Sequence, residues 1–105
     1  MSASRIEALQ KMLANRPDDA RLRFGLALEF MAQGKLEEGV RELRTYLEAS
    51  DDEGNAWGRL GSALRELGRD DEAREAYEVG IQSAQRHGHP TMADEFTEIL
   101  KSWDE

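Results

Sequence analysis

A pattern of large and small residues that repeats every 34 positions constrains the fold of this chain more than any other feature. Positions that hold a large apolar residue in the first copy hold one in the second, and small residues match small residues. The matched pairs are Leu26 with Leu60, Ala27 with Gly61, Phe30 with Leu64, Gly34 with Gly68, Gly39 with Ala73, Leu43 with Tyr77 and Leu47 with Ile81. A period of this length is typical of chains that stack similar supersecondary units.

Each copy reads as two amphipathic helices, because apolar residues recur at three- and four-residue spacing between stop signals. The stops are Pro17, the two matched glycines and the segment 87–90, which contains glycine and proline. Helices are therefore predicted at 4–16, 20–33, 36–49, 54–67, 70–86 and 90–103. Ser4 with Glu7 suggests a capping box, and an N-cap carboxylate is predicted in each of three turns: Asp18-Asp19, Asp51-Asp52 and Asp70-Asp71.

The second copy carries a recognisable motif. Trp and Leu-Gly are followed at fixed spacing by a large apolar residue, and later by Ala and an aromatic, at positions Trp57, Leu60, Gly61, Leu64, Ala73 and Tyr77. This order resembles the tetratricopeptide repeat. The resemblance covers about residues 4–103, with departures at Arg23, where an aromatic is expected, and Gln85, where a proline is usual.

The resemblance implies an all-α solenoid of antiparallel helix pairs, with about two repeats. We expect one domain over 1–105, divided into an N-terminal half-repeat helix at 4–16, repeat one at 20–53, repeat two at 54–87 and a capping helix at 90–103.

Composition narrows the classes of partner and chemistry. The chain has no cysteine, which excludes thiol chemistry, and a net charge of −8, which disfavours nucleic acid and anionic membranes. No apolar run has the length of a signal peptide core or membrane span, so we expect a cytoplasmic protein. Lysine is rare beside arginine, which is compatible with salt adaptation or with coding bias.

No catalytic or metal-binding pattern stands out. His87 and His89 lie near Asp94 and Glu95, but they lack the one-turn spacing that directs two imidazoles at one ion, so a polar helix stop is expected there. No phosphate-binding loop precedes a helix, and no Ser, His and Asp set has a credible arrangement. We therefore expect no cofactor, no metal and no enzymatic activity.

In the family that the chain resembles, the first helix of each pair lines a groove for peptides or helices. Carried over by position, the implied groove residues are Arg21, Phe24, Leu28, Met31, Asn55, Arg59, Ser62 and Arg65. The family's carboxylate clamp is not retained, apart from Asn55, Arg59 and Arg65 as anion contacts.

Two functions follow from this surface. In the first, the arginines attract an acidic peptide while the apolar residues receive its side chains, and the chain is an adaptor or scaffold. In the alternative, the groove is filled by a second copy and the chain is a homo-oligomeric unit, such as a homodimer. The apolar groove residues could equally bury against the N-terminal helix, with the arginines paired to local carboxylates.

Overall fold

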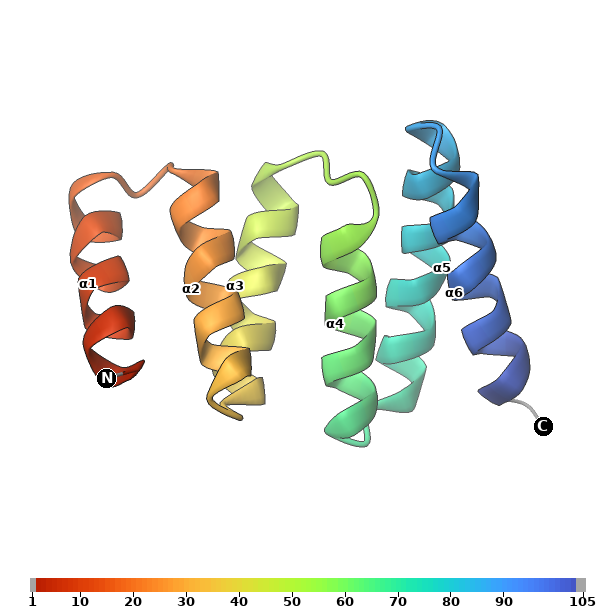
Figure 1. The fold of residues 1–105 in the computed structure, drawn as a ribbon, viewed down its shortest axis with the longest axis horizontal. Helices are drawn as coiled ribbons and strands as arrows, with labels where there is room; N and C mark the ends of the chain where they lie inside the picture. Colours follow the sequence, from red (N-terminus) through yellow and green to blue (C-terminus); the bar gives the residue numbers. More distant parts are fainter. Residues whose placement is uncertain (1, 104–105) are drawn as a thin grey trace. The chain divides into compact units, whose positions relative to one another are not determined.

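The computed structural model describes the backbone of residues 2–103 and the side chains of residues 5–103, which form six helices and no strand (Figure 1). Their bounds are α1 Ser2–Asn15, α2 Ala20–Ala32, α3 Leu36–Ala49, α4 Asn55–Glu66, α5 Asp70–Arg86 and α6 Pro90–Trp103. The predicted all-α fold of antiparallel helix pairs is confirmed. Within the described residues, no helix is long and apolar enough to cross a membrane.

Of the three predicted N-cap carboxylates, Asp19 is the N-cap of α2, Asp52 binds the start of α4 from two residues before its N-cap Gly54, and the third is wrong. Asp19 Oδ1 accepts from the Leu22 amide at 3.1 Å, and Asp52 Oδ2 accepts from the amides of Gly54 and Ala56, both at 2.9 Å. Asp70 instead lies inside the first turn of α5, where its charge favours the positive end of the helix dipole. Helix α1 begins two residues before the predicted cap Ser4, whose side chain lies outside the described residues.

Backbone contacts divide the chain into an N-terminal unit, residues 1–50, and a C-terminal unit, residues 51–105. The N-terminal unit holds α1 to α3, with α2 packed against both neighbours, and the C-terminal unit holds α4 to α6, with α5 packed against both. The assignment of one domain with two repeats at 20–53 and 54–87 stays a prediction.

One part of the core of the N-terminal unit lies where α1 meets α2. Ile6 and Leu13 of α1 form a buried cluster with Leu26 and Phe30 of α2. On the other side of α2, a Cβ added at Gly39 of α3 would overlap the Met31 side chain. Helix α2 is apolar on two sides, and it packs against α1 on one side and α3 on the other.

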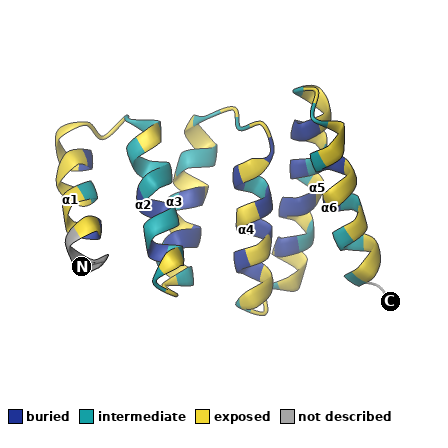
Figure 2. Cartoon of the chain, viewed as in Figure 1, coloured by how far each residue is buried: buried dark blue, intermediate teal, exposed yellow. Residues whose placement is uncertain are grey.

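In the C-terminal unit, aromatic rings lie directly on glycines of α4 and α5. A Cβ at Gly58 would lie 2.5 Å from Phe96 Cζ, and one at Gly61 would lie 2.8 Å from Tyr77 Cδ2. Figure 2 shows dark, buried segments along α4 and α5 that alternate with exposed ones. The missing side chains let the rings approach the backbone, so these glycines are part of the packing.

The ends of the helices are closed in two ways. Helices α2, α4 and α5 each end at a glycine with φ of 76°, 77° and 77°, and the next residue donates back to the helix, as Lys35 does to Phe30 O at 2.9 Å. Helix α3 ends at Ser50 in an extended conformation, with no glycine and no basic residue in its last turn. Across the described residues, no comparable backbone hydrogen bond closes the end of α3.

We expect the Gly58→Ala variant to be destabilised, because its new methyl group overlaps the Phe96 ring. Overpacking costs about 1–3 kcal/mol and outweighs the gain of about 1 kcal/mol in helix propensity. Gly25→Ala is the matched control, since its Cβ would lie 3.9 Å from Leu9 Cδ2, an ordinary contact. Urea denaturation should show loss of stability for the first variant and a gain of about 0.5–1 kcal/mol for the second. Equal stability of the two variants would contradict this packing.

Candidate interaction surfaces

The four residues of α2 assigned to a groove divide into two kinds. Arg21 is exposed and has no ionic partner among the described residues, and Leu28 is half-buried. Phe24 and Met31 pack against α3: the Phe24 ring lies 5.1 Å from that of Tyr46, and Met31 covers Gly39. Phe24 and Met31 thus contact α3, a neighbour that neither interpretation of the sequence named.

On α4, three of the assigned residues form an exposed polar row. Asn55, Arg59 and Ser62 are spaced by four and three residues, which places them on one face, and all three are exposed. Arg59 has no ionic partner within the described part of the chain. This face can therefore offer an uncompensated guanidinium flanked by an amide and a hydroxyl.

Arg65, the fourth assigned residue of α4, is already engaged by α6. Its Cζ lies 4.1 Å from the centre of the Trp103 ring, and Arg74 Cζ of α5 lies 4.8 Å from the same ring. The Tyr77 ring meets Trp103 edge-on at 6.3 Å. Two cation–π contacts thus hold the end of α6, an arrangement that the spacing of residues within one helix did not reveal.

Tyr77 is buried beneath this contact. Burial raises the pKa of the Tyr77 hydroxyl above 10.0, and the charge of Arg65 and a hydrogen bond with Ser62 oppose the shift. The phenol is therefore neutral at physiological pH. It gives the Arg65 guanidinium no counter-charge.

The two histidines pair with the segment before α4 and not with the carboxylates of α6. His87 Nε2 lies 3.1 Å from Asp51 Oδ2, and His89 Nε2 lies 2.5 Å from Glu53 Oε1. Arg86 also reaches Asp51, at 2.6 Å. Glu95 lies near His89, since both line one shallow pocket, but the ion pairs are made with Asp51 and Glu53, because the α5–α6 turn lies beside the segment before α4. Among the described residues, no group of three or more potential ligands could hold a metal ion.

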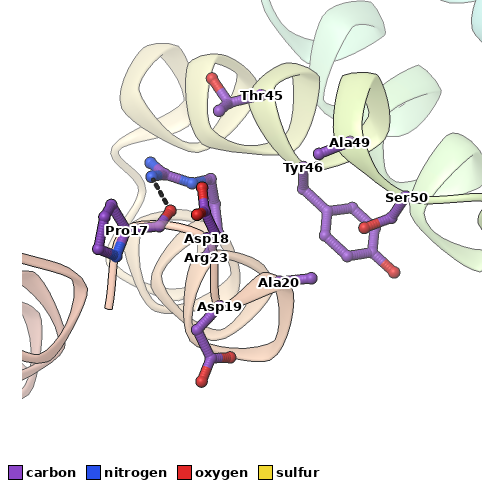
Figure 3. A pocket seen from close by; sticks show the side chains of 9 residues that line it. All are labelled: Pro17, Asp18, Asp19, Ala20, Arg23, Thr45, Tyr46, Ala49 and Ser50. Atoms are coloured by element: carbon purple, nitrogen blue, oxygen red, sulfur yellow. Dashed lines mark hydrogen bonds between the residues drawn. The ribbon is translucent and has the colours of Figure 1, made fainter. Parts of the chain in front are cut away.

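A pocket of about 330 Å³ opens between the start of α2 and the end of α3 in the N-terminal unit (Figure 3). Pro17, Asp18 and Arg23 line one side, and Tyr46, Ala49 and Ser50 line the other. Arg23 donates to Glu42 Oε1 at 2.8 Å and to Pro17 O at 3.3 Å. The sequence predicted that these two helices form a pair but not that a pocket remains between their ends, because a cavity depends on how the side chains pack.

Helix pairs with small residues at their crossings and polar outer faces define the chain as a helical-repeat protein. A family model described as tetratricopeptide repeat matches residues 24–87. This match spans more than half of the 105 residues, and the chain therefore belongs to the tetratricopeptide repeat family. Chains of this family serve as protein–protein interaction modules and are typically non-enzymatic.

Individual relatives agree with this assignment. The TPR repeat-containing protein PA0015 of Pseudomonas aeruginosa is 35% identical over 99 residues, which cover 94% of each chain. The solution structure of protein BPP2914 from Bordetella parapertussis is 30% identical with a TM-score of 0.78, covering 92% of this chain and 84% of that one. A structure of MamA AMB-1 is 26% identical with a TM-score of 0.69, and this chain spans 62% of its length.

The ion pairs of the histidine turn predict a change of stability at acid pH. The hydrogen bond from Arg86, together with the nearby His87 imidazole, lowers the pKa of Asp51 below 3.8, and the hydrogen bond with His89 lowers the pKa of Glu53 below 4.5. Carboxyl groups with lowered pKa values stabilise the fold above their ordinary pKa, and this stabilisation is lost as the pH falls through the folded-state value. We expect Asp51→Asn to lower the melting temperature at pH 5, with the difference from wild type vanishing near pH 2.

Asp94→Asn is the control for this measurement, because Asp94 is exposed and has no ionic partner in the described chain. Circular dichroism melts from pH 2 to pH 6 would measure the three proteins. A deficit in Asp51→Asn that persists unchanged down to pH 2 would contradict the role of the ion pairs.

Proposed function

We propose that the chain is an adaptor whose exposed α4 face binds a partner peptide or helix with acidic side chains. The observation that carries the proposal is Arg59, an exposed guanidinium without an ionic partner in a chain of net charge −8. Other arginines of the same chain, such as Arg23, Arg69 and Arg86, are paired with carboxylates. An unpaired arginine on such a surface favours a carboxylate from outside, since guanidinium and carboxylate form charge-assisted bidentate pairs.

The residues beside Arg59 suit a peptide. Asn55 can donate to and accept from a peptide backbone, and the Ser62 hydroxyl can do the same one turn from Arg59. On the N-terminal unit, the exposed Arg21 and the half-buried Leu28 of α2 offer a second face of the same kind, one cation and one apolar side chain. Phe24, Met31 and Arg65 serve the proposal indirectly, because their contacts within each unit hold α2 and α4 in place.

Arg59→Glu should weaken binding of a fluorescein-labelled decapeptide rich in glutamate and leucine by tenfold or more, because attraction becomes repulsion at the contact. Arg41→Glu is the matched control: Arg41 is exposed on α3, lacks an ionic partner among the described residues and gives the same change in net charge. Fluorescence anisotropy at low and high salt would measure both variants. Equal weakening by the two substitutions would reduce the effect to net charge and remove the α4 face from the proposal.

A second candidate function, assembly with another copy of the chain, is favoured by Met12. Its exposed fraction is 46%, and it is the one exposed large apolar side chain among the residues whose side chains are described. Exposed apolar side chains of this size often lie at contacts between proteins.

Light scattering on a sizing column separates the two functions. We expect the wild-type chain to elute as a monomer of 11.9 kDa up to high concentration, because a single exposed methionine buries too little area for a stable dimer. Met12→Gln is the control and should elute unchanged. A wild-type dimer that Met12→Gln converts to monomer would establish self-association instead.

A further inference from the structure

The pocket between α2 and α3 has a charge that differs from that of the α4 face. Asp18 and Asp19 line it, and two of the charges there have partners: Asp19 lies 4.0 Å from Arg16, and Arg23 lies 2.8 Å from Glu42. Asp18 is exposed and has no ionic partner in the described chain. The pocket thus carries an excess of negative charge, and a cation is the complementary ligand.

The end of α3 adds to this preference. The last carbonyls of any α-helix lack partners within the helix, and they form the negative end of its dipole. In this chain α2, α4 and α5 are closed by a glycine turn, whereas α3 has neither such a turn nor a basic residue in its last turn. Thr45, Tyr46, Ala49 and Ser50, all from this end, line the pocket. A hydrogen-bond donor of a ligand could bind the last carbonyl groups of α3, as backbone amides of the chain bind those of α2, α4 and α5.

The walls of the pocket suit a side chain with an apolar stem. The Tyr46 ring, held on one side by Phe24 at 5.1 Å, lies along one wall, and the Pro17 ring lies along another (Figure 3). A volume of about 330 Å³ is at the small end of ligand pockets, which suits one long side chain more than a larger ligand. An aromatic face also attracts a cation through its π-electrons.

We propose that this pocket binds the side chain of an arginine from a partner protein, with its guanidinium toward Asp18 and the end of α3 and its methylenes along Tyr46. The site lies wholly within the N-terminal unit and does not depend on the acidic-peptide surface of α4. The chain then recognises two opposite chemistries: carboxylates at Arg59 and a guanidinium at Asp18.

The probe for this site is the blocked pentapeptide Ac-Gly-Gly-Arg-Gly-Gly-NH2, titrated into the ¹⁵N-labelled full chain. We expect dissociation constants on the order of 1 mM, and amide shifts concentrated at Ala20, Tyr46 and Ser50. The same peptide with citrulline, a neutral isostere of arginine, should cause much smaller shifts. Equal shifts from both peptides, or shifts of similar size at surface carboxylates such as Glu75 and Glu78, would overturn the proposal.

Two substitutions test the pocket directly. Asp18→Asn should weaken arginine-peptide binding about two- to five-fold, the range for a partly exposed charge pair, whereas Asp71→Asn, at an exposed carboxylate of α5, should leave it unchanged. Ala49→Lys places a cation in the last turn of α3. It should abolish binding and raise the melting temperature by about 1–4 °C, and the neutral control Ala49→Gln should do neither.

Unchanged affinity in Asp18→Asn, or full binding by Ala49→Lys, would overturn the assignment. Asp18 and Ala49 are both exposed, so these variants should fold normally, and their amide spectra report the fold in the same experiment.

Discussion

Close contact between aromatic rings and helix backbones is the interaction on which the C-terminal unit depends. Phe96 of α6 lies against Gly58 of α4 and Gly80 of α5, and Tyr77 of α5 lies against Gly61. These contacts require that the glycines carry no side chain, because a Cβ at Gly58 or Gly61 would lie within 2.8 Å of ring carbon atoms. Gly58 and Gly61 therefore define the buried face of α4, and side chains on its other face, such as Arg59, are exposed to solvent.

In the N-terminal unit a side chain also packs directly on a glycine, but it is the flexible side chain of a methionine and not an aromatic ring. Met31 covers Gly39 where α2 meets α3, and the Phe24 and Tyr46 rings meet further along the same pair of helices. Because α2 buries residues against both α1 and α3, little apolar surface on it remains for a partner. What is left for recognition is mainly polar: single arginines without ionic partners, and a pocket with excess negative charge. In the functions proposed above, these few unbalanced charges select the partner.

Much of the fold could be predicted because periodicity and stop signals are local properties of the sequence. The predicted ranges of α3, α5 and α6 match the structure, and the ends of the other helices differ by no more than two residues. The site was predicted less completely. Helical spacing showed that Phe24 and Met31 share an apolar surface but could not say which neighbour covers it, and α3 does. The same spacing put Arg65 on the α4 face without showing that Trp103, 38 positions later, lies over its guanidinium.

The sequence by itself determined the helices, the positions where small residues admit close packing and the exposed row of Asn55, Arg59 and Ser62, since these depend on neighbours within one or two turns. Only the tertiary structure decided which charges are balanced. Asp51 and His87, and likewise Arg65 and Trp103, are distant in the chain and adjacent in space. The pocket at the end of α3 was likewise decided only by the tertiary structure, because a cavity exists only once two helices have packed and left space between them.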